Sequence, residues 1–229
     1  MDNKKLARFI TALGQFDSYG STVAQTELAI ATGCTSHLRQ DNDDVVIFQD
    51  CLKAINKVQD MTFGVKSIIA INTEFNGDAS TQPKYPGRLR DMVAHGPEDR
   101  IRVPLWADEN RETVFHYPPH QVDELDVQRI VDEWEISEKT KIDAWKMFGR
   151  LACLQPFQDG NKRTALISIN HAMGKLNDQH YLLPPPGLDF NDFMSNLLKY
   201  YYWSKSDKSE QMREMFAKHA VEHEVVPAK

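Results

Sequence analysis

The chain has 229 residues, 41% hydrophobic and 26% charged, which is long and apolar enough to bury a substantial core. Its 27 Lys and Arg against 33 Asp and Glu give a net charge of −6, which argues against a broad surface for nucleic acid or anionic membrane but allows a local basic pocket. The three cysteines lack metal-type spacing and no segment resembles a signal peptide or membrane span, so we expect a cytoplasmic protein with reduced thiols that does not bind membranes.

Near the N-terminus, residues 26–40 show the alanine-to-glycine spacing of a helix-turn-helix, with Ala29 and Gly33, and Arg39 is available for phosphate or base edges. The acidic stretch DNDD at 41–44 would repel a duplex, and the apolar position after Gly33 is displaced by one residue. DNA binding through this segment is therefore a disfavoured alternative function.

Most of the chain shows helical periodicity, because apolar residues recur at steps of three or four. The pattern predicts amphipathic helices near 44–58, 62–75, 121–134, 139–154, 190–203 and 207–222. A further helix beginning near 161 is apolar on nearly every side and should be central. The expected fold class is all-α.

One segment departs from this pattern. Residues 100–119 contain two short β-prone runs around ADEN, which predicts a hairpin, and Pro104 confines the first strand to an edge. The YYYW run at 200–203 could stack on nucleic acid bases, but its apolar neighbours favour a helix face that packs on the core.

The most informative stretch is LQPFQDGNKRTAL, residues 154–166, a polar turn between two apolar helices. Pro156 cannot continue the first helix, so residues 161–163 lie in the first turn of the next. That end of a helix attracts anions, yet Lys162 and Arg163 place two cations there. Something negative is expected to compensate them.

A phosphate chain fits this turn. Backbone amides of Gly160 and Asn161 would surround one phosphate, the Arg163 guanidinium would hold another, and Asp159 would hold Mg²⁺. The alternative is a plain capping turn, with Asp159 as the cap and both cations in solvent.

The sequence QPFQDGNKR resembles the signature of the Fic family, H-P-F-x-D/E-G-N-G/K-R, and matches it at every specified position but the first. YPGRLR at 85–90, the hairpin and PPHQVDEL at 118–125 follow in the family's order, so the similarity covers about 60–203. It implies a Fic-type helical bundle with a small β-hairpin flap, and transfer of AMP from ATP to a hydroxyl of a target protein. Residues 1–59 would be an N-terminal helical segment, 60–203 the Fic core and 204–229 a C-terminal helical extension.

The resemblance also implies a role for each matching residue. Phe157 would be the buried anchor of the turn and Asp159 the ligand of Mg²⁺. Gly160 and Asn161 would form the anion hole for ATP, and Arg163 would bind its distal phosphates.

Lys162 stands where AMP-transferring members have glycine, while the death-on-curing branch, which transfers a phosphoryl group, tends to have lysine. Which phosphorus is attacked therefore stays open. By the same resemblance a target protein would dock by strand addition on the hairpin flap, through residues that include Arg102, Val103, Thr113, Val114 and Phe115.

Gln155 is the departure from the pattern, because the family has a histidine there that removes the proton from the attacking hydroxyl. A glutamine has no basic nitrogen near neutral pH. We therefore expect nucleotide binding with weak or absent transfer. His116 and His120 are candidate substitutes, whereas His171 lies about 15 Å along its helix from the turn and should be packed.

Many Fic proteins carry an inhibitory helix with the pattern S/T-x-x-x-E-G/N, whose glutamate pairs with the motif arginine. The nearest stretch here is TGCTSH at 32–37, with Ser36 in the glutamate position. This alignment predicts a remnant of that helix and no acidic clamp on Arg163.

Overall fold

The computed structural model describes residues 2–40, 42–90, 101–107 and 111–224, and these form ten α-helices, two short 3-10 turns and one two-stranded hairpin. The predicted all-α class with a small hairpin is confirmed. Contacts group the chain into two compact units, Met1–Arg88 with Phe157–Leu183, and Leu89–Pro156 with Pro184–Lys229. This grouping follows different boundaries from those that the sequence suggested at 59 and 203.

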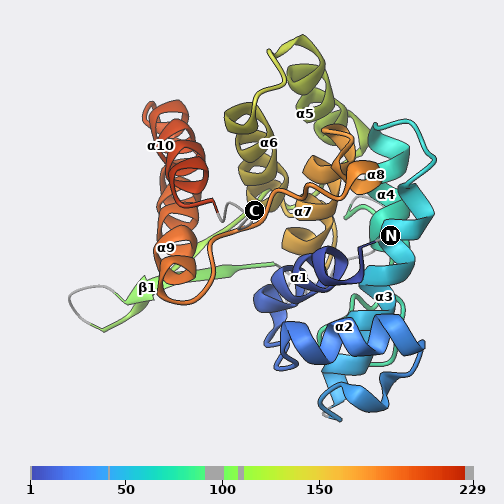
Figure 1. The fold of residues 1–229 in the computed structure, drawn as a ribbon. Coiled ribbons are helices and arrows are strands. Elements are labelled where there is room, and N and C mark those ends of the chain that lie inside the picture. The colour runs from blue at the N-terminus through green and yellow to red at the C-terminus, as the bar shows by residue number, and fades with distance from the viewer. Residues whose placement is uncertain (1, 41, 91–100, 108–110, 225–229) are drawn as a thin grey trace. The chain divides into compact units, whose positions relative to one another are not determined.

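Among its described residues, the first unit has helices and loops but no strand. It contains α1 (Asn3–Gly14), α2 (Val23–Thr32), α3 (Asn42–Val58), α4 (Val65–Thr73), α7 (Asn161–Ala172) and α8 (Lys175–Asp178). Helix α7, gold in Figure 1, contacts α1, α3 and α4. Ten of its twelve residues are buried, as expected for the predicted central helix.

The segment with helix-turn-helix spacing has another structure. Helix α2 ends at Thr32, Gly33 is left-handed with φ 67°, and Thr35–His37 form only a 3-10 turn before α3 begins at Asn42. A DNA-binding helix-turn-helix needs its second helix after a turn of about 3–4 residues. The disfavoured helix-turn-helix alternative therefore does not hold, because the residues after Gly33 do not continue into a recognition helix.

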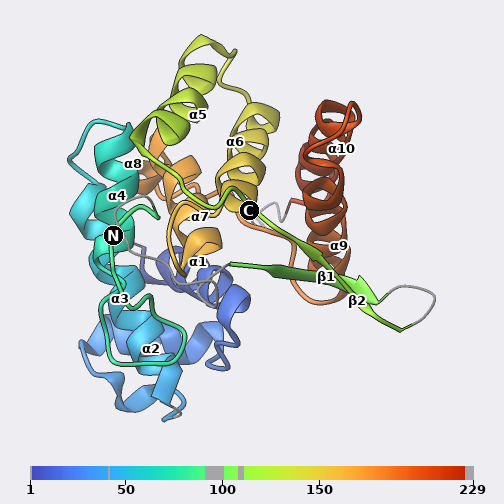
Figure 2. The same cartoon turned by 180° about the vertical axis from the view of Figure 1, so that it is seen from behind.

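The second unit contains α5 (Glu124–Ile136), α6 (Lys141–Leu154), α9 (Leu188–Trp203) and α10 (Ser209–Glu222). Helix α10 packs on both α6 and α9, and it runs beside α9 in Figures 1 and 2. Aromatic rings fill the space between these helices, with centroids 5.2 to 6.4 Å apart, and they come from Trp145, Phe148, Phe193 and Phe216.

The predicted hairpin is also in this unit, formed by β1 (Val103–Ala107) and β2 (Thr113–His116), and Figure 2 shows both strands. Val103 pairs with His116, and a bulge lies between Pro104 and Trp106. The hairpin contacts α9, where the rings of Trp106 and Tyr202 lie 5.0 Å apart.

The YYYW run is only partly a core face. Tyr200 and Tyr201 are buried, as predicted, whereas Tyr202 is 48% exposed. Among the described residues, no helix has both the length and the apolar character needed to cross a membrane. None of the three cysteines forms a disulfide.

Two buried histidines predict how stability depends on pH. Burial lowers the pKa of both His116 and His171, and the ring Nε2 of each faces a backbone carbonyl, at 3.1 Å and 2.8 Å. A lowered folded pKa means that the unfolded chain binds more protons as the pH falls below the ordinary histidine value of about 6.5.

The free energy of unfolding should therefore be highest above that value and fall as the pH decreases through the lowered pKa values. Urea titrations at several pH values between 5 and 8 would measure it. Replacing both histidines by glutamine should flatten this slope, and an unchanged slope would contradict the assignment.

Candidate functional site: the turn between α6 and α7

The predicted turn is present between two helices. Helix α6 ends at Leu154, Gln155 is left-handed with φ 52°, and Pro156 follows. On the other side Gly160 is left-handed with φ 73° and α7 begins at Asn161. The boundary between the compact units falls after Pro156, within this turn.

Gln155 uses its side chain to close the end of α6. It is 7% exposed, its Nε2 donates to the carbonyl of Ala152 at 2.6 Å, and its backbone N–H donates to Leu151 O at 3.2 Å. Burial raises the pKa of Tyr201 well above its usual value, and the nearby Gln155 side chain opposes the shift. The amide thus has a capping role at the position where the family has its base.

Arg90 holds the same end of α6. It is 3% exposed, and burial lowers the pKa of its guanidinium to about 10. The guanidinium donates to four backbone carbonyls, Gln155 at 2.5 Å, Pro119 at 2.6 Å, Leu154 at 3.1 Å and His120 at 3.1 Å. A cation at a helix C-terminus is favoured by the helix dipole, so Arg90 ties position 155 to the segment after the hairpin.

Replacing Arg90 with methionine should lower the free energy of unfolding by about 3–5 kcal/mol, because buried carbonyls lose charged donors. Urea unfolding would measure this loss. The matched control is Arg129→Met, whose side chain is 70% exposed and pairs with Asp126 at 2.9 Å, and which should cost at most about 1 kcal/mol. Equal losses in the two variants would show that Arg90 has no such role.

On the α7 side, two hydrogen bonds between Phe157 and Asn161 stabilise the turn. Phe157 is fully buried; its N–H donates to Asn161 Oδ1, and Asn161 Nδ2 donates back to Phe157 O, both at 2.9 Å. The burial expected for Phe157 is therefore found. The Asn161 side chain faces the turn, which leaves only its backbone for the predicted anion hole.

Gly160 is required by both conformation and space. A Cβ there would lie 2.7 Å from Phe75 Cδ2, and the positive φ is strained for other residues. Asn72 supports the same turn, because its Nδ2 donates to Asp159 O at 3.0 Å and to Thr164 Oγ1 at 3.3 Å.

The N-terminus of α7 has no side-chain cap and no acidic residue in its first turn. The amides of that turn and the helix dipole therefore favour an anion. The Gly160 N–H donates to Asp159 Oδ1 at 2.6 Å, although Asp159 is exposed. Asp159 thus contacts one amide of the predicted anion hole without being the N-cap residue.

Arg163 is fully buried, so the alternative that places both motif cations in solvent is wrong for this residue. Its Nη2 donates to Thr81 O at 2.6 Å, its Nη1 to Gln82 Oε1 at 3.2 Å, and its guanidinium lies 4.6 Å from the Phe75 ring centroid. The Nε forms an ion pair with Asp17.

Asp17 is the residue that sequence reasoning missed. It closes the 3-10 turn Gln15–Asp17 after α1. Burial raises the pKa of this carboxyl, and the charges of Arg163 and Lys162 oppose the shift. The prediction that Arg163 lacks an acidic clamp is therefore wrong. Ser36 is exposed and its hydroxyl lies 2.9 Å from Cys34 Sγ.

No pattern in the sequence indicates that Asp17 would compensate the motif cations, because it lies 146 positions before Arg163 in the chain and belongs to no recognisable motif. The sequence predicted a negative partner for the cations of the turn. For Arg163, that partner is the Asp17 carboxylate.

The chemistry of the turn suits a cation held mainly by phosphates. The described part of the chain has no cluster of three or more His, Cys, Asp and Glu side chains that could hold a metal alone. Mg²⁺ on a nucleotide commonly takes one or two protein carboxylates, with phosphate and water as its other ligands. The exposed Asp159 carboxylate beside the N-terminus of α7 fits that pattern.

The residues predicted for target docking lie on the hairpin. Val103 and Val114 are half-buried, and Thr113 is exposed. The Arg102 guanidinium stacks 4.6 Å from the centroid of the half-buried Phe115 ring. These side chains share one element of the second unit, whereas the candidate phosphate ligands belong to the first.

The histidines considered as substitute bases differ in their surroundings. His116 is buried, with its Nε2 3.1 Å from Cys153 O, and His171 is packed against Met61 O, as predicted. His120 is exposed, and its carbonyl accepts from Arg90.

Comparison with known proteins agrees with the signature in the turn. The family model described as Fic/DOC family matches residues 63–173, which include α4, the hairpin, α5, α6 and α7. No curated protein matches the chain. Residues 63–173 of the chain therefore belong to the Fic/DOC family.

Proposed function

We propose that the chain binds ATP with Mg²⁺ at the start of α7 and that its transfer of AMP to a target-protein hydroxyl is weak or absent. The observation that carries the proposal is the N-terminus of α7, where Gly160 is the N-cap residue and provides no side-chain cap. Lys162 and the buried Arg163 lie in the first turn of this helix. The N-terminus of a helix with cations beside it is a strong anion site.

In this proposal the backbone amides of Gly160 and Asn161 bind one phosphate and Arg163 binds another, in place of Asp17. Asp159 is the protein ligand of Mg²⁺, which neutralises phosphate charge when bound. Phe157 and the Phe157–Asn161 hydrogen bonds keep the amides in position. The nucleotide therefore competes with an internal carboxylate.

The transfer step would need a group that removes a proton from the target hydroxyl. General-base catalysis contributes about 10²–10⁴-fold in rate, and the Gln155 amide cannot supply it. The phosphate contacts do not depend on that base. Binding without efficient transfer is therefore the expected behaviour.

A protein target would dock on the hairpin flap by strand addition. In the described residues each strand of the two-stranded sheet has one partner, which leaves an edge for an extended segment. Arg102, Val103, Thr113, Val114 and Phe115 are the residues on which such a segment would lie.

Isothermal titration calorimetry with ATP and MgCl₂ tests the binding part directly. We expect saturable one-site binding that is lost in Gly160→Ala, because the added Cβ meets Phe75. Lys218→Met, at a side chain that is 56% exposed, is the matched surface control and should bind like the parent. No heat from the parent chain would refute the nucleotide site.

Lys162 supports a second candidate, a phosphotransferase like the death-on-curing branch. Its positive charge acts to lower the pKa of the Asp17 carboxyl, against the larger effect of burial. The Lys162 ammonium therefore adds positive charge to the same anion site. Transfer of the γ-phosphoryl group rather than AMP would be its signature, and labelled ATP distinguishes the two.

A further inference from the structure

The second unit contains a cavity of about 220 Å³. It lies between the end of β2, helices α5 and α6, and the end of α9. It is smaller than the roughly 300–1,000 Å³ of pockets that enclose drug-sized ligands, so it suits a small molecule or ion. Its polar lining comes from His116, Arg129, Arg150, Tyr200, Ser204 and Lys205, with Asp126 as the acid.

The charge of this lining is unusual for an acidic chain. Three cations, Arg129, Arg150 and Lys205, face one carboxylate, Asp126. Arg129 pairs with Asp126 at 2.9 Å, and Arg150 pairs with Glu133 outside the cavity. Lys205 contacts no carboxylate within 4.0 Å among the described residues, and its Nζ donates only to Tyr117 O at 2.8 Å. Two of its three N–H donors are therefore available.

Tyr200 supplies an independent observation. It is 5% exposed and lines the cavity, and within the described part of the chain its hydroxyl has no hydrogen-bond partner. Burial raises its pKa beyond the usual range, so the hydroxyl stays a neutral donor. Because Tyr200 lines the cavity, its hydroxyl can donate to an acceptor bound there.

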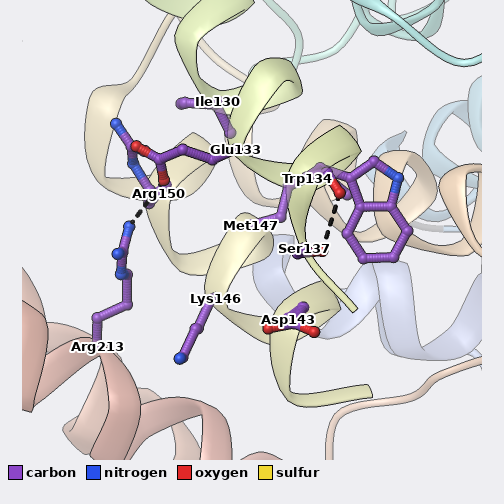
Figure 3. Close-up of a pocket in the computed structure, with 9 residues that line it drawn as sticks. All are labelled: Ile130, Glu133, Trp134, Ser137, Asp143, Lys146, Met147, Arg150 and Arg213. Atoms are coloured by element: carbon purple, nitrogen blue, oxygen red, sulfur yellow. Dashed lines mark hydrogen bonds and ion pairs between the residues drawn. The ribbon is translucent and has the colours of Figure 1, made fainter. Parts of the chain in front are cut away.

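A neighbouring cavity of about 170 Å³ shows the contrast (Figure 3). It is lined by Lys146, Arg150 and Arg213, and each of these cations has an acidic partner. Glu133 contacts both arginines. Lys146 pairs with Glu214, which does not line the cavity. Every cation that lines that cavity is therefore paired with a carboxylate. In the cavity beside Lys205, the Lys205 ammonium has no such partner among the described residues.

We infer that the cavity beside Lys205 binds a small phosphate-class oxyanion, held by the Lys205 ammonium and the Arg150 guanidinium, with the Tyr200 hydroxyl as a further donor. Arg150 keeps donors that its pair with Glu133 does not use, since a guanidinium has five. The site is separate from the turn at Gly160 and does not depend on nucleotide binding there.

The NMR signals of the His116 ring can report binding at this site. It lines the cavity, and the positive charge of Lys205 contributes to lowering its pKa. An anion beside Lys205 should shift the His116 ring resonances and raise the midpoint of their pH titration. The His116→Gln variant identifies those resonances.

The experiment follows the histidine ring signals by NMR while pyrophosphate, inorganic phosphate or glycerol 2-phosphate is added, with NaCl at matched ionic strength as the blank. We expect a saturable shift of the His116 signal. Lys205→Met should weaken binding at least about tenfold, since it removes a charged donor. Whether pyrophosphate or the ester binds more tightly tells a free anion from an esterified phosphate.

Tyr200→Phe gives a second, independent outcome. It should weaken binding by about two- to tenfold, the effect of one neutral hydrogen bond. Its urea midpoint should stay unchanged or rise, because the hydroxyl has no partner in the described structure. Lys218→Met removes the same charge elsewhere in the unit and should bind like the parent.

The inference is overturned if the His116 signal does not move, or if it moves equally in the parent and Lys205→Met. Citrate binding more tightly than every phosphate would also overturn the assigned class of ligand. Pyrophosphate binding that survives Lys205→Met without moving His116 would place the anion elsewhere on the chain.

Discussion

Replacing Asp17 with asparagine is expected to tighten the binding of ATP and Mg²⁺ by about tenfold or more, within the 5–150-fold range of typical couplings between sites. The physical reason is competition, because the Asp17 carboxylate is paired with Arg163 and a phosphate would have to replace it. Titration calorimetry at a fixed Mg²⁺ concentration measures the change. Asp60→Asn, at an exposed position of the same unit, is the control and should leave the affinity unchanged.

The same variant should be less stable without nucleotide, by about 3 kcal/mol, because a fully buried guanidinium loses its charged partner. Saturating ATP and Mg²⁺ should restore more stability to Asp17→Asn than to the parent, since a ligand stabilises by an amount set by its affinity. Urea unfolding with and without nucleotide gives both numbers. Weaker nucleotide binding in Asp17→Asn would mean that Asp17 supports the site instead of competing for it.

Helices and the hairpin were predictable because their signals are local. The periodic apolar residues of α6 and α7, and the two β-prone runs around ADEN, each depend on residues within one segment. The burial of Phe157 was likewise implied by a contiguous signature. The helix-turn-helix, which the sequence offered only as a disfavoured alternative, does not form. The residues between Gly33 and α3 include a 3-10 turn, which local spacing does not predict.

The contacts that define the site chemistry were not predictable in the same way. Asp17 reaches Arg163 only through the packing of α1 near α7, and no residue beside Asp17 indicates this. Arg90 lies in a stretch that the family resemblance included, yet its four carbonyl contacts depend on the fold of Pro119, His120 and the end of α6. Long-range polar contacts require the tertiary structure.

Gln155→His is expected to raise transfer to a target hydroxyl by about 10²–10⁴-fold, the contribution of a general base. The change restores a titratable nitrogen at the end of α6, where Arg90 holds the backbone carbonyl of position 155 at 2.5 Å. The glutamine cap on Ala152 O would be lost, so urea unfolding should accompany the assay and shows whether the variant is folded.

The assay incubates parent and variant with cell lysate and ATP labelled at either the α- or the γ-phosphate, followed by gel separation. Label from α-labelled ATP alone identifies AMP transfer, and label from γ-labelled ATP alone identifies phosphoryl transfer of the kind that Lys162 favours. The double variant Gln155→His with Asp159→Asn should lose the signal, which separates transfer at this motif from kinases in the lysate.

Equal labelling by the parent and Gln155→His would contradict the role given to position 155, since the glutamine cannot accept the proton. Combining Gln155→His with Asp17→Asn extends the argument, because one change acts on proton removal and the other on access to Arg163. If the two act independently, their effects on the transfer rate at low ATP should multiply. A combined effect no larger than that of Gln155→His alone would show that Asp17 does not restrain nucleotide binding.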